Sequence, residues 1–368
     1  MNWRVSLWVD MCGLHLSDVE SGSDIAMSVH SVAIACPKGA KTGGPEALHQ
    51  LCRAIQDLGI DAFLVNTGKA THEIDEYRKY EVPWRSFDSL RTADILVIPE
   101  TLTVLPDSWY KAFSGKTIVW WLSVDNSSFS SARHNEFRTH PLPGIWNVKR
   151  SALETVRALS NSFYGTIKAV SQSKKPVKID YGQVAVLPEN CFHIAQSVYA
   201  QRWVTEALST VPMLVSDYIW HNRVEIGEEP KFEKPPKSKR AAIVAYNPAK
   251  GGELVRLVQR FTSKSVSFVA LTGMSAREIS GVLNAADLYL DLGHFPGRDR
   301  MPREAALAGC PVLIARRGSA RYYQDFPLSD YYLLDLELES PESVAERIEQ
   351  MIGQRGKHVD KQKLFFDT

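Results

Sequence analysis

Short apolar runs alternate with helical patterns in the first part of the chain. The runs that predict buried strands are SVAIAC (31–36), DAFLVN (61–66), ADILVIP (93–99) and KTIVWWLSV (116–124). Between the first two, residues 45–59 place Leu48 and Leu51 on one face of a predicted helix that begins at Pro45 and ends at Gly59. Strands this apolar are typical of a parallel sheet that helices cover on both faces. The pattern therefore predicts βαβ units.

The same alternation returns in the last third of the chain. Apolar runs that predict strands lie at 241–246, 266–271, 287–292, 311–315 and 331–336. Helices are predicted from Glu253, from a capping box formed by Ser275 and Glu278, over 302–308 and over 341–352. Two such stretches in one chain predict an α/β protein with two doubly wound, Rossmann-like domains in tandem.

A segment of different composition separates the two patterned stretches. Residues 228–240 (EEPKFEKPPKSKR) are rich in proline and basic residues, with almost nothing apolar, which indicates a solvated linker. We therefore expect a poorly patterned leader at 1–29, an N-terminal domain at 30–227 and a C-terminal domain at 241–352. We expect residues 353–368 to form a tail that can pack back on the N-terminal domain.

The composition is that of an ordinary globular protein. With 368 residues, 44% hydrophobic and 23% charged, the chain is long enough for two domains that each have a core. Its 43 basic and 42 acidic residues give a formal net charge of +1, so no global field attracts nucleic acid or anionic lipid. The five cysteines form no CxxC pair, which argues against a disulfide framework and a zinc site. Since no run approaches the roughly 18 apolar residues of a membrane span, we expect a cytoplasmic protein with at most peripheral membrane association.

Candidate binding chemistry lies in the loops after the predicted strands, because ligands of open α/β sheets bind beyond the carboxyl ends of the strands. The stretch FPGRDRMPRE places Arg298, Arg300 and Arg303 around the start of a predicted helix. Guanidinium groups beside the N–H groups of a helix start suit an anionic diphosphate, and Glu304 suits a hydroxyl group. Alternatively, one or two of the arginines pair with Asp299, Glu304 or the other domain.

Two further loops carry glycines at the start of a helix. In CPKGAKTGGPE, Gly43 and Gly44 permit a ligand to approach the backbone closely. In YNPAKGGE, Asn247 and Lys250 precede a helix in a second arrangement that suits phosphate. Neither loop contains GxGxxG or GxxxxGK[ST], which disfavours a nicotinamide dehydrogenase and a P-loop kinase. We expect Lys250, Arg298 and Arg300 to form the positive half of a cleft whose other wall is the Gly43 loop.

These stretches resemble known motifs. EAALAGCPVLI is similar to the EAMACGxPVV donor-site signature of GT-B fold glycosyltransferases, especially the large retaining family usually numbered four, with Glu304, Gly309, Pro311 and Val312 in step. GGPE resembles the N-terminal glycine loop of that family, and NPAKG resembles its RxxxxKG element with the lysine retained. HFPGRDRMPREAA and SVDN also resemble a bacterial set found near polysaccharide gene clusters. The resemblance covers about residues 30–350.

The resemblance implies a GT-B fold, in which two Rossmann-like domains face a cleft, and the activity of a hexosyltransferase-like glycosyltransferase. The nucleotide-sugar donor would lie on the C-terminal domain, and a saccharide, lipid-linked or other acceptor would enter from the N-terminal domain. Glu304 would hold the ribose hydroxyls, and Lys250 and an arginine would bind the diphosphate. The residues that we predict to bind the donor are Gly43, Gly44, Asn247, Lys250, His294, Gly297, Arg298, Arg300, Arg303 and Glu304.

Two departures from the family pattern affect the prediction of sugar recognition. Pro296 replaces the first glutamate of the family, and Ala245 stands where an arginine precedes the lysine. The sequence has no DxD pair for a metal, so cations of the protein must stabilise the leaving diphosphate, and we expect neither a metal nor a cofactor. The family is thought to retain the anomeric configuration, with the leaving phosphate taking the acceptor proton. We therefore expect a retaining, metal-independent enzyme.

An inverting enzyme would need a protein base. Asp125 follows a buried strand and is the best placed candidate for a base or an acceptor contact, and its alternative role is turn formation or helix capping. The predicted catalytic residues are Asp125, Lys250, Arg298 and Glu304. The predicted acceptor contacts are Asp125, Asn126 and Trp146, the last of which lies in a long irregular segment of a kind that often carries function.

Three other functions stay open. A nucleotide-sugar epimerase or phosphorylase could use the same two-domain cleft, and a non-catalytic nucleotide-sugar-binding protein would explain the missing glutamate at position 296. A DNA-base glycosyltransferase is also open, although the balanced charge makes nucleic acid an unlikely partner. Product analysis with and without an acceptor would separate the enzymes. Donor hydrolysis that is sensitive to Glu304→Ala would exclude the binding protein.

Overall fold

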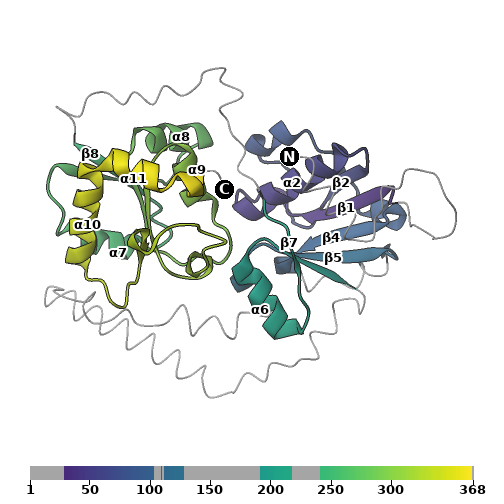
Figure 1. Cartoon of the computed structure of the whole chain (residues 1–368). Helices are drawn as coiled ribbons and strands as arrows, with labels where there is room; N and C mark the ends of the chain where they lie inside the picture. Colours follow the sequence, from purple (N-terminus) through teal and green to yellow (C-terminus); the bar gives the residue numbers. More distant parts are fainter. Residues whose placement is uncertain (1–28, 103–108, 110–111, 128–190, 218–240, 367–368) are drawn as a thin grey trace, which may run out of the picture.

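The computed structural model describes residues 29–102, 109, 112–127, 191–217 and 241–366 (Figure 1). Two separate parallel sheets organise these residues. Residues 1–28 of the expected leader, the expected linker at 228–240 and Trp146 lie outside the described residues.

The first sheet contains seven parallel strands in the order β3-β2-β1-β4-β5-β6-β7. The strands are β1 (Ser31–Cys36), β2 (Asp61–Asn66), β3 (Trp84–Arg85), β4 (Ile95–Pro99), β5 (Lys116–Trp121), β6 (Phe192–Ala195) and β7 (Met213–Leu214). Side chains alternate between the two faces of each strand. Ile34 packs on the face covered by α2 (Gly43–Gln56), and Ala33 packs on the opposite face, with α6 (Val198–Leu208). The sheet is therefore buried on both faces, as its apolar strands predict.

The second sheet contains five parallel strands in the order β12-β11-β10-β8-β9. The strands are β8 (Ala242–Tyr246), β9 (Val266–Ala270), β10 (Leu288–Asp291), β11 (Val312–Ala315) and β12 (Leu333–Leu334). The helices are α7 (Gly252–Gln259), α8 (Ala276–Ala285), α9 (Arg300–Leu307), α10 (Pro341–Gly353), α11 (Arg355–Lys361) and α12 (Lys363–Phe366). The capping box at the start of α8 is present. The prediction of an α/β fold with two parallel, doubly wound sheets is confirmed.

Several elements differ from their predicted bounds. The helix α2 begins at Gly43, so both glycines of the predicted loop lie in its first turn. The helix α9 begins at Arg300, which places this arginine on the helix itself. The strand predicted over 331–336 shortens to Leu333–Leu334, because Asp330–Tyr332 form a 3-10 turn before it.

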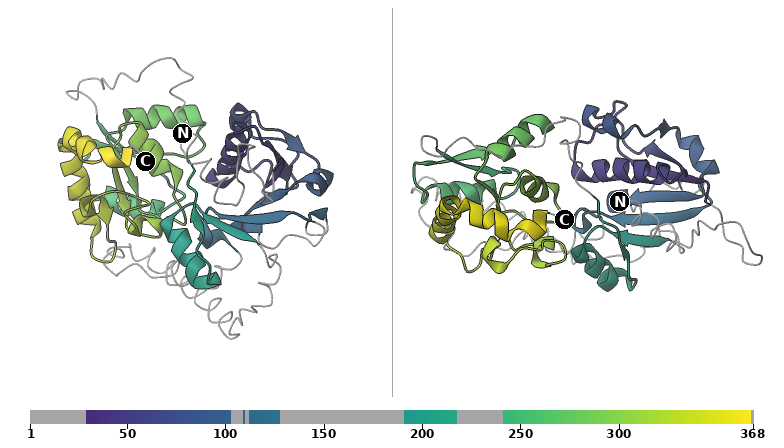
Figure 2. Two further views of the ribbon diagram at one scale, coloured as in Figure 1. Left: turned by 45° about the vertical axis from the view of Figure 1, so that its right-hand side comes forward. Right: turned by 45° about the horizontal axis from the view of Figure 1, so that its top comes forward.

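The strand order reverses once in each sheet, between β1 and β4 in the first and between β8 and β10 in the second. The helices α2 and α9 lie at the boundary between the two bodies (Figure 1), and α6 lies at the same boundary in two further views (Figure 2). Open α/β sheets bind their ligands at the carboxyl ends of the strands where the order reverses. The loops after β8 and β10 are therefore the expected binding loops of the second sheet.

The segment after residue 352 packs within the second body. Gln362 forms two hydrogen bonds of 2.9 Å with the backbone of Val312, and Phe365 stacks on Phe326. We expected residues 353–368 to be able to pack back on the N-terminal domain. The contacts of Gln362 and Phe365 are with the C-terminal domain, whose core buries the Phe365 side chain, and packing on the N-terminal domain stays a prediction.

Candidate functional site

The loops after β8 and β10 meet where the strand order of the second sheet reverses. Gly251 has a φ of 71°, and a Cβ atom there would lie 2.7 Å from the carbonyl carbon of Leu292. A Cβ atom on Gly293 would lie 2.6 Å from the Cβ atom of Lys250. Because a larger residue at either position would collide with the opposite loop, the two glycines bring Lys250 next to the loop that carries the arginines.

Lys250 lies at this contact with its side chain 31% exposed. Its Nζ forms an ion pair with Asp299 and lies 5.9 Å from the centre of the Phe295 ring. Asn247 shapes the same loop, because its side-chain oxygen accepts the N–H of Ala249 at 3.0 Å. Lys250 is thus accessible to a ligand, whereas the oxygen of Asn247 is used inside the loop.

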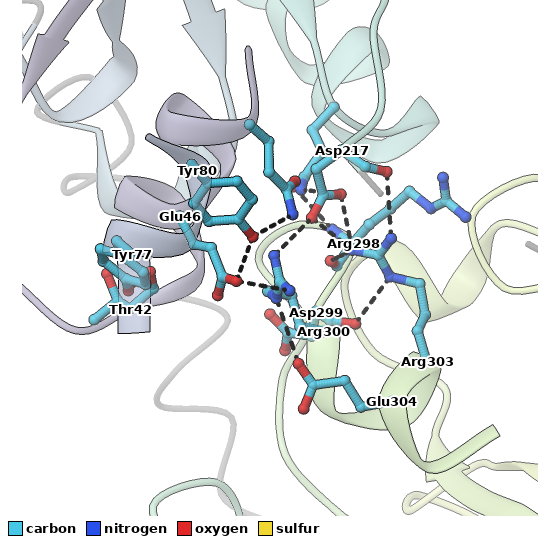
Figure 3. A network of polar contacts seen from close by, with 12 residues as sticks. Thr42, Glu46, Tyr77, Tyr80, Asp217, Arg298, Asp299, Arg300, Arg303 and Glu304 are labelled. Atoms are coloured by element: carbon cyan, nitrogen blue, oxygen red, sulfur yellow. Dashed lines mark hydrogen bonds and ion pairs between the residues drawn. The ribbon is translucent and has the colours of Figure 1, made fainter. Parts of the chain in front are cut away.

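Arg300 begins α9 and faces α2 of the first sheet (Figure 3). Three carboxylates surround its guanidinium, namely Glu46 at 3.4 Å, Glu304 at 3.5 Å and Asp217 at 3.8 Å. Burial opposes the charge of Arg300, but the three carboxylates outweigh it, so the pKa of Arg300 lies above its usual value. A Cβ atom on Gly43 would lie 3.1 Å from Cδ of Arg300, so the glycine loop and the arginine meet, as the sequence predicts. Gly44 lies beside them in the first turn of α2.

Arg303 is 1% exposed and forms a buried ion pair with the first domain. Its Nη2 donates to the two oxygens of Asp217 at 2.8 and 3.0 Å and to the carbonyl of Arg298 at 2.8 Å. A buried guanidinium whose donors already have protein acceptors is not available to a ligand. Pairing with the other domain, the alternative weighed from the sequence, is thus the observed arrangement of Arg303, and its role as a donor contact stays a prediction.

Gly297 and Arg298 also lie where the two domains touch. A Cβ atom on Gly297 would lie 2.0 Å from the carbonyl oxygen of Leu122, so the close approach of the two domains requires a glycine there. The N–H of Arg298 donates to Oε1 of Gln196 at 3.3 Å, and the residue is 9% exposed. Its side chain extends away from Arg300 (Figure 3). The structure thus brings Arg300, but not the Arg298 side chain, to the contact with α2.

Asp325 adds a further link between the domains. Its carboxylate accepts the N–H groups of Val198 and Tyr199 at 2.8 and 3.0 Å, in the first turn of α6. Burial raises the pKa of Asp325, although the two N–H groups oppose this effect. We call the buried contacts of Gln196, Asp217, Gly297, Arg303 and Asp325 across the two sheets the interdomain junction.

Asp125 and His294 link the loops that follow β5 and β10. Nε2 of His294 lies 2.6 Å from Oδ2 of Asp125, and the hydroxyl of Tyr199 donates to Oδ1 at 2.9 Å. Both oxygens of the Asp125 carboxylate therefore have a partner, and its role as a base or acceptor contact stays a prediction. Asn126 donates from Nδ2 to Oγ of Ser123 at 2.8 Å and so helps to shape the same turn.

Two buried carboxylates hold the backbone of these two loops. Glu100 accepts the N–H groups of Leu122 and Ser123 at 2.9 and 3.0 Å. Asp291 accepts the N–H of Gly293 at 2.9 Å. Burial raises the pKa of each carboxyl group to about 7, although the N–H donors oppose it. The loops that carry Asp125 and His294 are thus each supported by a carboxyl group that titrates near neutral pH.

The raised pKa of Glu100 predicts a pH-dependent stability. The folded protein holds this proton more tightly than the unfolded chain, so the free energy of unfolding should fall as the pH rises from 4.5 to about 7. We expect Glu100 to contribute a fall of roughly 3 kcal/mol, at 1.36 kcal/mol per pKa unit. Urea unfolding on both sides of this pH interval measures the effect, and Glu100→Gln should flatten the slope. An unchanged slope in this variant would contradict the prediction.

Membrane-spanning helices and metal-binding clusters are both absent from the described residues. Among them, no helix is both long enough and apolar enough to cross a membrane. Within the same residues, no group of three or more histidine, cysteine, aspartate or glutamate side chains is arranged to hold a metal ion.

The sequence prediction missed the acidic residues that face the cations. Asp217 follows the apolar run PMLVS, which is the signal that singled out Asp125, so the same search would have found it. Glu46 lies in the GGPE motif, directly after Pro45, where the predicted helix begins. Their partners, Arg300 and Arg303, lie on α9 of the other domain, and no local sequence pattern indicates ion pairs between domains.

Comparisons with known proteins give similarity in fold only. No protein-family model and no curated protein matches the sequence. The lipopolysaccharide outer core galactosyltransferase WaaB matches with a TM-score of 0.56 and 9% identity, over 92% of this chain and 96% of that chain. WaaG, a glycosyltransferase involved in lipopolysaccharide biosynthesis, matches with a TM-score of 0.54 and 13% identity, over 92% of this chain and 95% of that chain.

Sucrose-phosphate synthase from Thermosynechococcus elongatus matches with a TM-score of 0.53 and 12% identity, over 92% of this chain and 93% of that chain. Identities this low do not carry a substrate or a reaction from one protein to another. The structural similarities agree with the two parallel sheets of this chain. The chain therefore has the two-domain α/β fold of the GT-B glycosyltransferases.

Proposed function

We propose that this protein is a hexosyltransferase-like glycosyltransferase, which moves a sugar from a nucleotide-sugar donor to a saccharide, lipid-linked or other acceptor. The observation that supports this function best is that Lys250 pairs with Asp299, the residue before Arg300, where the strand order of the second sheet reverses. The proteins of similar fold include a galactosyltransferase and a glycosyltransferase of lipopolysaccharide biosynthesis.

The proposed donor site uses Lys250 and Arg300 for the diphosphate. Arg300 is surrounded by carboxylates at 3.4 to 3.8 Å, so phosphate oxygens at normal hydrogen-bond distance would be stronger partners. Glu304 lies one helical turn after Arg300 with its side chain 32% exposed. From this position it can accept hydrogen bonds from ribose hydroxyl groups.

The proposed reaction retains the anomeric configuration and needs no metal ion. The bond between the anomeric carbon and the diphosphate oxygen breaks, and the acceptor oxygen bonds to the same face of that carbon. The acceptor proton passes to a phosphate oxygen of the leaving nucleoside diphosphate, so no protein base takes part. Lys250 and Arg300 stabilise the negative charge that grows on the leaving group.

We expect one class of nucleotide sugar to raise the melting temperature, with or without EDTA. Binding to the native state adds about 2.7 kcal/mol of stability at a ligand concentration 100-fold above Kd. Thermal unfolding with UDP-, GDP-, dTDP- and CMP-sugars, each with and without EDTA, measures this effect. If none of the donors shifts the melting temperature, the proposed function is wrong. A shift that EDTA removes would contradict only the metal independence.

Turnover distinguishes a transferase from a non-catalytic binding protein. The donor that stabilises the protein is incubated first with water alone and then with saccharide acceptors, and release of the nucleoside diphosphate is measured. The proposed function requires release, and the anomeric NMR signal of the product should show retention. Inversion would contradict the retaining reaction and would point to the His294–Asp125 pair as the base.

A further inference from the structure

Arg300 has an unusual set of partners for a buried arginine. Its side chain is only 13% exposed, yet each of its three carboxylate contacts is 3.4 Å or longer, and Nη1 has no hydrogen-bond partner among the described residues. Arg303, three residues later, donates at 2.8 Å to both a carboxylate and a carbonyl. Buried donors are normally hydrogen-bonded. Arg300 is therefore held mainly by charge, and its hydrogen-bond donors are not all used. This is the state expected of an arginine that binds a ligand.

Glu46 is the carboxylate that faces Arg300 from the first domain. It also accepts the hydroxyl of Tyr80 at 2.7 Å and lies 3.3 Å from Nζ of Lys79, and its side chain is 16% exposed (Figure 3). These contacts do not involve Arg300. Glu46 would thus keep two partners if another anion took its place at Arg300, so the contact can exchange without leaving a buried charge unpaired.

The other two carboxylates are less free to exchange. Asp217 is fixed by Arg303 at 2.8 Å and by Nε2 of Gln196 at 2.7 Å in the interdomain junction. Glu304 is on the same helix as Arg300 and moves with it. Asp217 also has partners of its own, but its side chain is 0% exposed, whereas that of Glu46 is 16% exposed, so Glu46 is the carboxylate that can move away from Arg300.

We propose that Glu46 is a resident counter-ion of Arg300 that an incoming phosphorylated anion displaces. This inference rests on the proposed donor site. An anion that enters must replace the Glu46 carboxylate and then stay beside it, so the charge of Glu46 weakens the binding of each such anion at Arg300.

The experiment compares inorganic pyrophosphate with inorganic phosphate on the whole chain by isothermal titration calorimetry. The variant is Glu46→Gln, which removes the charge but keeps an oxygen for the Tyr80 hydroxyl. We expect Glu46→Gln to tighten the binding of both anions about ten-fold, since like charges a few ångströms apart repel strongly at partly buried sites. The matched control is Glu76→Gln, which removes a carboxylate from a pair with Lys41 nearby on the same domain.

Each result decides the inference. If Glu46→Gln leaves both affinities unchanged or weakens them, or if Glu76→Gln gives the same gain, Glu46 is not a counter-ion that the anion displaces. Arg300→Ala is measured alongside. If the wild-type chain binds pyrophosphate, Arg300→Ala abolishes that binding and Glu46→Gln does not tighten it, only this inference fails. If the wild-type chain binds neither pyrophosphate nor any nucleoside diphosphate, the proposed function fails together with it.

Discussion

Replacing Arg300 with alanine is expected to lower kcat/KM for the donor by about 10²- to 10³-fold, the loss typical when a group that stabilises developing charge is removed. Arg300 begins α9 in the second domain and lies beside Glu46 of the first domain and Glu304 of its own helix. Its guanidinium is therefore at the contact between the two domains, where we propose that the diphosphate binds. Steady-state kinetics with the stabilising donor would measure the effect. Arg300→Lys should recover only part of the activity, because lysine keeps the charge but lacks the planar fork.

The control for this prediction is an arginine on a neighbouring helix. Arg256 on α7 has a side chain that is 66% exposed and pairs with Glu253. Arg256→Ala should leave kcat/KM within a factor of about two, because an exposed ion pair contributes little. Equal losses in Arg256→Ala and Arg300→Ala would mean that net charge, and not a placed guanidinium, controls the reaction.

Replacing Asp217 with asparagine is expected to lower the free energy of unfolding by about 3–5 kcal/mol, the usual effect of leaving one member of a buried ion pair without its partner. Asp217 contributes a side chain that is 0% exposed, and Arg303 one that is 2% exposed. Chemical denaturation of the full chain would measure the loss. Because the pair joins the two sheets, we expect the transition to become less cooperative as well.

A second carboxylate–arginine pair provides a matched control. Arg85 and Asp61 form two hydrogen bonds of 2.7 Å, but their side chains are 39% and 47% exposed. Asp61→Asn should therefore cost only about 0–1 kcal/mol. If Asp217→Asn and Asp61→Asn lowered the stability equally, burial in the interdomain junction would not be the reason for the effect.

The sheets could be predicted from the sequence because their strands are short, apolar and separated by amphipathic helices. Residues 31–36 and 61–66 form the predicted strands without change, and the capping box at Ser275 marks the start of α8. Lys250 lies in the loop after β8, and Arg300 begins the helix that follows β10, so both belong to connections after strands, where such folds bind ligands. Local patterns were sufficient for these features.

The separate roles of the three arginines could not be predicted. Arg300 and Arg303 both lie in the first turn of α9. An arginine at either position could contact a ligand or form a buried ion pair, and the local sequence does not distinguish the two roles. Their roles depend on Asp217 and Glu46, and Asp217 is 86 residues away from Arg303 along the chain. Such pairs arise only when the two sheets come together, and one sequence without its fold contains no signal for them.

The contact of Asp325 with the start of α6 has a consequence for engineering the molecule. The carboxylate of Asp325, in the second domain, accepts the N–H groups of the first turn of α6, in the first domain. The second half of the chain therefore supplies the cap for a helix of the first half. A chimaera that exchanges the second half for that of another GT-B protein would leave the N–H groups of Val198 and Tyr199 without an acceptor unless the new half supplies one. Recombined halves should therefore be chosen for the residue that they bring to this position before they are chosen for their donor preference.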